Sequence, residues 1–168
     1  MNTLSPNVKQ SRLRLAGMLK SYILRRSELQ KLHVSALQAQ RRGQREVCGM
    51  LASDENGQLE LRFLNNRSQR AGQFSMARAD YLKAREAIRR MGKRVLGTFH
   101  SHPISEAIPR RGDLAGTALN SFCLIYDVCG REPRLWKIVK RRDQRVAKEV
   151  PLKSHQKLRQ DRRGNTEG

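Results

Sequence analysis

Apolar residues recur at helical spacing in two segments of the chain. In the first segment, the positions that share one helical face are Leu29, Leu32, Ala36 and Ala39. Ser27 followed by Gln30 matches the capping box that opens a helix, and Gly43 is suited to end one. We therefore predict an amphipathic helix that begins at Ser27 and ends at Gly43.

The second segment with this spacing begins at Asp80. Its apolar face comprises Tyr81, Ala84, Ile88 and Met91. An aspartate side chain can accept hydrogen bonds from the first free backbone amides of a helix, so Asp80 is the expected cap. Gly92 can adopt the left-handed conformation that ends a helix. A second amphipathic helix is predicted between these two residues.

Short apolar runs bounded by turn residues predict the strands. The expected strands are Val47–Ala52, Leu59–Leu64, Val95–His102, Ser121–Val128, Arg134–Val139 and, as the weakest, Arg145–Val150. Asn56-Gly57 separates the first two and is a strong signal for a β-hairpin, while Pro103 ends the third. A loop over residues 104–112 leads to a small-residue helix that begins near Asp113. Because helices and strands alternate without a glycine-rich phosphate loop, we predict a small α/β domain with a mixed sheet.

Basic residues are concentrated at both ends of the chain, outside the predicted centre of the domain. The net charge is +20, from 35 Lys+Arg and 15 Asp+Glu. Residues 1–45 hold ten basic residues and one acidic residue, residues 131–168 hold thirteen and five, and the stretch between them holds twelve and nine. We interpret residues 1–20 as a basic arm, residues 21–152 as the folded domain and residues 153–168 as a basic, disordered tail.

The basic ends permit two interpretations. Such segments attract polyanions by counterion release, whatever the sequence of the partner, or they only solubilise the protein. No aromatic RNA-binding motif, zinc finger or recognition helix accompanies the charge. Nucleic acid therefore stays one candidate partner, beside a protein with an acidic face.

The chain carries no segment typical of export or of a membrane span. Its amino terminus lacks the continuous apolar stretch of a signal peptide, and no run approaches the roughly 20 apolar residues of a spanning helix. We expect a cytoplasmic protein that does not enter the membrane. Cys48, Cys123 and Cys129 form no CxxC pair and lie in apolar runs, so they are predicted to be reduced and to pack as small core residues.

The sequence His-Ser-His-Pro at residues 100–103 is the feature that points to chemistry. Side chains at i and i+2 of a strand point to the same face, so His100 and His102 can bind one ion. Two neutral imidazole nitrogens, one carboxylate and a water form an open, hydrolytic zinc site. Asp113 is the candidate carboxylate, because the loop after Pro103 is long enough to return and Gly112 eases a tight approach.

Hydrolysis at such a site also needs a group that accepts a proton and later donates it. Glu46 is the candidate, because it opens an apolar run where an unpaired carboxylate would be out of place. The alternative is that Glu46 is a solvent-facing residue at a strand edge. The other two histidines, His33 and His155, are assigned no functional role.

Three short sequence motifs occur in an order and at a spacing that resemble those of a known protein family. They are Glu46-Val-Cys-Gly-Met-Leu, then Gly97-Thr-Phe-His100-Ser-His102-Pro103 and, after six residues, Arg110-Arg-Gly-Asp113. This order resembles the JAMM (MPN-plus, JAB-type) zinc metalloproteases, whose pattern is a glutamate, HxHP, six residues and SxxD. The stretch from about Ser21 to Val139 resembles a bacterial, single-domain JAMM protein throughout.

The resemblance implies the family fold, a small mixed-sheet α/β domain of the JAMM/MPN (cytidine-deaminase-like) type with flanking helices. It also implies a zinc ion (Zn²⁺) on His100, His102 and Asp113, with Glu46 as a catalytic residue, and cleavage of peptide or isopeptide bonds. Characterised members of the family often remove ubiquitin or ubiquitin-like proteins, and bacterial relatives act on sulfur-carrier proteins with a similar fold. We therefore expect a protein substrate of this type.

The chain departs from the family at one position, where Arg110 replaces the serine. In the family that hydroxyl helps to stabilise the oxyanion of the tetrahedral intermediate. Arg110 is also a donor and can stabilise an oxyanion if its side chain folds back, or it can repel the metal and disable the site. Ser105 is an alternative source of the hydroxyl, and Glu106 an alternative ligand.

Three functional interpretations stay open on the sequence alone. The first is a zinc peptidase or isopeptidase that uses Glu46 as proton relay. The second is a catalytically weak JAMM-like scaffold that binds a partner, as metal-free family members do. The third is a nucleic-acid-binding module that acts through its basic ends. Metal content separates the first two, and a steep salt dependence of nucleic-acid binding favours the third. The oligomeric state does not follow from the sequence.

Overall fold

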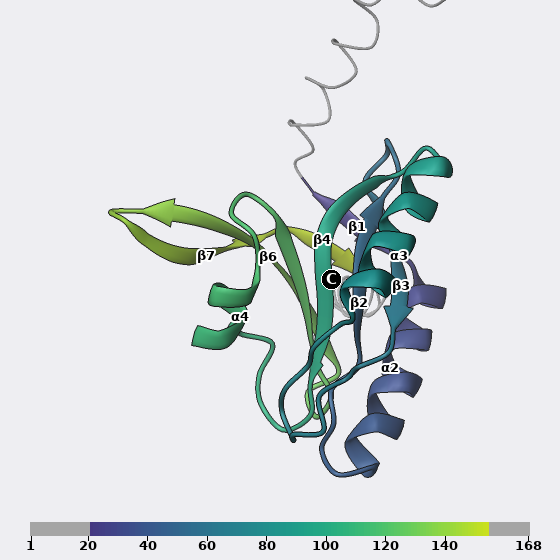
Figure 1. Cartoon of the computed structure of the whole chain (residues 1–168), viewed down its shortest axis with the longest axis vertical. Helices are drawn as coiled ribbons and strands as arrows, with labels where there is room; N and C mark the ends of the chain where they lie inside the picture. Colours follow the sequence, from purple (N-terminus) through teal and green to yellow (C-terminus); the bar gives the residue numbers. More distant parts are fainter. Residues whose placement is uncertain (1–20, 155–168) are drawn as a thin grey trace, which may run out of the picture.

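The computed structural model of the chain describes residues 21–154 (Figure 1). In chain order the elements are β1 (Tyr22–Leu24), α2 (Arg26–Arg41), β2 (Cys48–Ser53), β3 (Gln58–Leu64), α3 (Arg78–Arg90), β4 (Arg94–His102), α4 (Arg111–Gly116), β5 (Phe122–Asp127), β6 (Glu132–Arg141), β7 (Gln144–Val150) and β8 (Leu152–Ser154). The predicted basic arm, residues 1–20, and residues 155–168 of the predicted tail lie outside the described residues, as does His155.

Within these residues the strands form one eight-stranded sheet in the order β7-β6-β5-β4-β2-β3-β1-β8. The sheet is mixed, because β4 pairs with β5 in parallel while β2 pairs with β3 and β4 in antiparallel fashion. The predicted α/β class and mixed sheet are therefore confirmed. The hairpin predicted at Asn56-Gly57 also forms, and Gly57 has a left-handed φ of 79°.

The helices lie on opposite faces of the sheet. Leu29 and Leu32 of α2 pack with Phe99 of β4 in the larger hydrophobic core. Ala84 and Ile88 of α3 pack on the other face, against Met50 and Ala52 of β2. Alternate residues of the central strands therefore contribute to different cores, as the period of a strand requires. Among the described residues, no helix is both long and apolar enough to cross a membrane.

The predicted N-caps of α2 and α3 were wrong, although the predicted apolar faces are largely buried. The predicted helix ends were right, because Gly43 and Gly92 follow the C-cap residues with left-handed φ angles of 94° and 71°. Arg25 and Ala77 occupy the two N-cap positions and make no side-chain capping bonds, so Ser27 and Asp80 lie inside the first turns. The backbone amide of Leu29 already donates to the carbonyl of Arg25 at 3.0 Å, and that bond starts the helix before Ser27. Asp80 still interacts favourably with the helix dipole from its place in the first turn.

The carboxyl-terminal boundary also differs from the prediction. Lys153 and Ser154, which were expected to open a disordered tail, lie in β8 and pair in parallel with β1. Cys48 and Cys123 are buried as predicted. Cys129 is exposed, contrary to the prediction, because it lies in the turn between β5 and β6, where its thiol lies 3.3 Å from the carbonyl of Pro103.

Candidate metal centre

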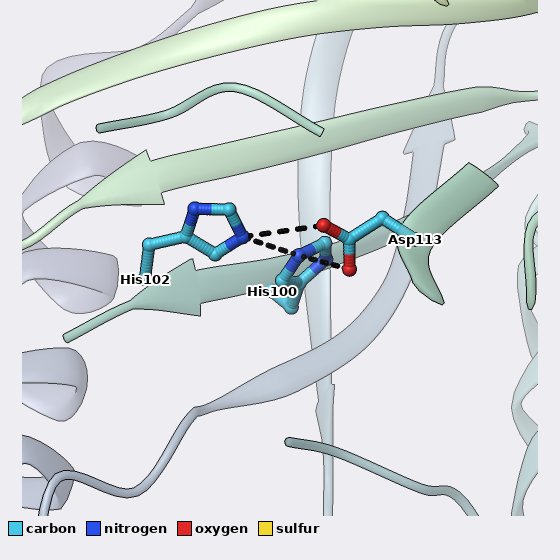
Figure 2. Close-up of side chains that lie close together, drawn as sticks. All are labelled: His100, His102 and Asp113. Carbon is cyan, nitrogen blue, oxygen red and sulfur yellow. Dashed lines mark hydrogen bonds and ion pairs between the residues drawn. The ribbon is translucent and has the colours of Figure 1, made fainter. Parts of the chain in front are cut away.

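The end of β4 and the first turn of α4 bring three polar side chains together. His100 and His102 lie two residues apart on β4 and are fully buried, and Asp113 approaches them from α4 (Figure 2). The Nε2 atoms of the two histidines are 3.1 Å apart. His100 Nε2 is 3.1 Å from Asp113 Oδ1, and His102 Nε2 is 3.4 Å from Asp113 Oδ2. The predicted juxtaposition of these three residues is thus present.

The opposite edge of each imidazole contacts a group that fixes its orientation. His102 Nδ1 lies 2.7 Å from the backbone carbonyl oxygen of Glu106. His100 Nδ1 lies 3.6 Å from the sulfur of Cys123 on β5, and the His100 ring stacks on Phe74 with centroids 4.6 Å apart. A histidine that donates from Nδ1 presents the Nε2 lone pair to a metal. Both rings are therefore held with Nε2 directed at the shared position.

The spacing of the three donor groups fits a tetrahedral zinc ion. Tetrahedral zinc with bonds of about 2.0–2.1 Å to nitrogen and oxygen needs neighbouring donor atoms roughly 3.3 Å apart. The separations of 3.1, 3.1 and 3.4 Å among His100, His102 and Asp113 match that requirement. These are the three residues in the described part of the chain whose donor atoms form such a group.

The protonation of the three groups is coupled in the absence of a cation. Burial raises the pKa of Asp113, but its hydrogen bonds with His100 and His102 lower it further, to well below the usual range. Burial lowers the pKa of His100, whereas its contacts with Cys123 and Asp113 raise it, with a net rise to about 10. The carboxylate therefore stays ionised, and a positive charge is favoured at the position where the three side chains meet.

Glu46 lies beside this cluster in the segment that enters β2. It is 2 % exposed, so it is not the solvent-facing strand-edge residue that the alternative interpretation required. Its Oε1 accepts a hydrogen bond of 2.5 Å from Arg110 Nη2, and its Oε2 is buried without a hydrogen-bond partner among the described residues. A buried, partnerless carboxylate oxygen is costly unless a ligand or water completes it.

Arg110 connects Glu46 with Asp113. It is the N-cap residue of α4, which begins at Arg111, near Asp113 as predicted. The backbone amide of Arg110 donates to Asp113 Oδ2 at 2.7 Å, which orients that carboxylate toward the histidines. Its guanidinium group binds Glu46 and remains 44 % exposed. Arg110 therefore lies between the two carboxylates and also reaches the solvent.

The two alternative site residues do not join the cluster. The side chains of Ser105 and Glu106 are exposed in the loop after β4, and Glu106 contributes only its backbone carbonyl. The sequence did not point to that carbonyl, nor to Cys123 and Phe74 as neighbours of the histidines. The position of Cys123 could have been inferred in part, because strand periodicity aligns it with the histidine face once β4 and β5 are known to pair.

The cluster opens into a groove of about 880 Å³. Glu46, Arg110 and Asp113 are among the residues that line it. The groove is also lined by residues 95–98 of β4, by Tyr81 on α3 and by residues 116–118 at the end of α4 and just after it. A groove of this volume, lined by charged groups and by strand residues, can accept a peptide segment.

Comparison with known proteins identifies similar sequences. A family model described as prokaryotic homologs of the JAB domain matches residues 30–139. A desampylase from Pyrococcus furiosus is 41 % identical over 71 residues, which are 42 % of this chain and 51 % of that protein. The chain thus spans about half the length of the curated relative it matches.

Solved structures with a similar fold are also known. Protein DSY2949 from Desulfitobacterium hafniense aligns with a TM-score of 0.60 and 27 % identity, over 80 % of this chain and 94 % of that one. A protein from Salinibacter ruber aligns with a TM-score of 0.52 and 21 % identity, over 80 % and 92 % of the two chains. The similarity to the Salinibacter ruber protein shows a shared fold and nothing more.

Proposed function

Because the chain belongs to the prokaryotic JAB-domain family, we propose that it is a zinc-dependent peptidase or isopeptidase of the JAMM type. The observation that carries the proposal is the set of donor separations among His100, His102 and Asp113, which suits tetrahedral zinc at the end of an open groove. The test is elemental analysis of the purified protein together with an assay for cleavage of an isopeptide-linked ubiquitin-like protein.

His100, His102 and Asp113 would hold the zinc ion, and the groove side would remain open. When bound, zinc supplies a Lewis acid for the scissile carbonyl and lowers the pKa of water toward neutrality. The protein contributes fixed ligands, since both imidazoles are buried and oriented through their Nδ1 atoms. Such preorganisation avoids a reorganisation cost during the reaction.

Glu46 is proposed to move the proton. Its partnerless Oε2 accepts a proton from the attacking water and later donates it to the leaving amine, so the group ends each turnover in its starting state. The hydrogen bond from Arg110 to Oε1 keeps the carboxylate in position during both transfers. Burial excludes competing solvent from the carboxylate, which strengthens its interactions with the reacting groups.

The substrate class is proposed to be a ubiquitin-like or sulfur-carrier protein whose carboxyl-terminal tail enters the groove. Two observations support it: the name desampylase of the similar protein, which indicates an activity on a protein conjugate, and the contribution of β4 residues 95–98 to the lining of the groove. The tail would approach along residues 95–98 and present its last carbonyl near Asp113 and Arg110.

Arg110 is proposed to stabilise the oxyanion in place of the family serine. Loss of one oxyanion donor costs about 10²–10³ in rate, so Arg110→Ala should lower kcat by that factor. The zinc content should change little, because Arg110 orients Asp113 through its backbone amide, which alanine retains. Arg110→Ser, which introduces the family residue, should recover part or all of the activity. Turnover and zinc stoichiometry of the purified variants are the measurements.

Arg111→Ala is the matched control for this series, because Arg111 is the next residue, is exposed and is equally charged. Its activity should equal that of the wild type. An inactive wild type that becomes active as Arg110→Ser would instead mean that Arg110 disables the site. Equal activity in the wild type and Arg110→Ala would assign the oxyanion to Ser105 or to backbone amides.

A further inference from the structure

Much of the positive charge predicted for the carboxyl-terminal end lies on a folded hairpin. β6 and β7 pair from Leu135↔Val150 to Arg141↔Gln144, and β7 is an edge of the sheet. β5 pairs with β6 only as far as Lys137, so the hairpin continues beyond the sheet as a two-stranded ribbon. Figure 1 shows this ribbon projecting from the body of the domain, above α4.

The hairpin tip, residues 140–145, is strongly basic. Its basic residues are Lys140, Arg141, Arg142 and Arg145, and its acidic residue is Asp143. Asp143 pairs with Lys140 at 2.8 Å, and both side chains are largely exposed. Arg141 and Arg142 are exposed and form no ion pair with another described residue. Lys140 lies opposite Arg145 in the ladder, but Asp143 offsets the charge of Lys140, so Arg141 and Arg142 are the cations that the tip offers to a partner.

The hairpin tip is joined to one wall of the groove by hydrogen bonds. Arg145 Nη1 donates to the carbonyl oxygens of Thr117 and, at 3.4 Å, of Leu114. The amide of Asn120 donates to the carbonyl of Ile138 at 2.7 Å. Thr117 itself lines the groove. A molecule that occupies the groove therefore has the basic tip beside it, on the same rigid unit.

We infer that the hairpin tip is a docking surface for an acidic face on the body of the protein substrate, while the substrate's tail occupies the groove. The inference rests on the proposed function and adds the part of the chain that recognises the folded portion of the substrate. A protein is favoured over nucleic acid because the tip is fixed to the groove wall that leads to Asp113 and Glu46. Charged groups at the edge of an interface chiefly raise the association rate and fix the orientation of the partner.

The test reverses two charges at the tip without touching the groove wall. Arg141→Glu/Arg142→Glu should weaken binding of an acidic ubiquitin-fold protein with a free glycine carboxyl terminus by about tenfold at low salt, measured by fluorescence anisotropy. The difference should shrink toward zero as salt rises and the Debye length falls below about 5 Å. Zinc content should stay unchanged. Binding needs no cleavage, so this result is independent of whether the proposed hydrolase activity exists.

The matched control is Arg25→Glu/Arg26→Glu, which makes the same change in net charge at exposed positions that begin α2 on the opposite face of the sheet. It should bind like the wild type. If cleavage occurs, the tip variant should lose kcat/KM on the protein conjugate but not on a short peptide conjugate carrying only the tail. Equal losses in tip and control variants, or unchanged binding, would overturn the inference. The inference would also be overturned if the tip variant lost binding to a short duplex DNA but still bound the protein. That result would assign the tip to nucleic acid.

Discussion

His102→Ala and Asp113→Ala should each lose the zinc ion that the wild type is expected to carry. Each substitution removes one of the three protein ligands of the zinc ion. Loss of a residue that hydrogen-bonds to a metal ligand lowers metal affinity roughly 10- to 100-fold, and loss of the ligand itself should lower zinc affinity by more. Zinc per chain after purification without chelators is the measurement. The fold should persist, because neither residue belongs to the hydrophobic clusters that join the helices to the sheet.

Two further variants sharpen this prediction. Asp113→Asn retains an oxygen that can accept the hydrogen bond from Arg110, so α4 keeps its start while the charge on the site is lost. It should still lower zinc affinity, which would separate ligand loss from local unfolding. His33→Ala is the matched histidine control, since His33 on α2 contacts Tyr126 instead of the cluster. A wild type that is purified metal-free and cannot take up zinc would contradict the catalytic proposal.

Glu46→Gln should retain zinc and lose turnover. The amide has nearly the same shape as the carboxylate, and its oxygen can still accept the hydrogen bond from Arg110. It cannot accept a proton from water, so kcat should fall by about 10²- to 10⁴-fold, the usual contribution of general acid–base catalysis. Single-turnover cleavage of a protein conjugate, with zinc content measured on the same sample, tests both halves of the expectation.

Glu106→Gln is the control for that variant. Glu106 is an exposed glutamate in the loop after β4 and touches the site only through its backbone carbonyl. Its conversion to glutamine should leave zinc content and turnover unchanged. Release of the metal from Glu46→Gln would mean that Glu46 is a ligand, and unaltered turnover would mean that another group moves the proton.

The difference between prediction and structure at the helix starts has a local cause. Ser27 and Asp80 are good capping residues, yet each helix begins earlier, because the preceding backbone already has the geometry to accept the first helical bond. Several neighbouring residues can serve as the N-cap of a helix, and the side chain at that position contributes only about 1 kcal/mol to helix stability. Packing of the apolar face, which the sequence predicted well, contributes more.

The α/β class, the approximate strands and the face shared by His100 and His102 were all predictable from the amino-acid sequence, because side-chain alternation along a strand is a local property of the chain. Asp113 was also expected at this site, from its spacing after His102 and Pro103. The pairing of Arg110 with Glu46, and the place of the carboxyl-terminal charge on a hairpin beside the groove, became visible only in the folded chain. These contacts join residues that are distant in the sequence, and they depend on strand order and on the path of loops. Neither is encoded in a local periodicity of the sequence.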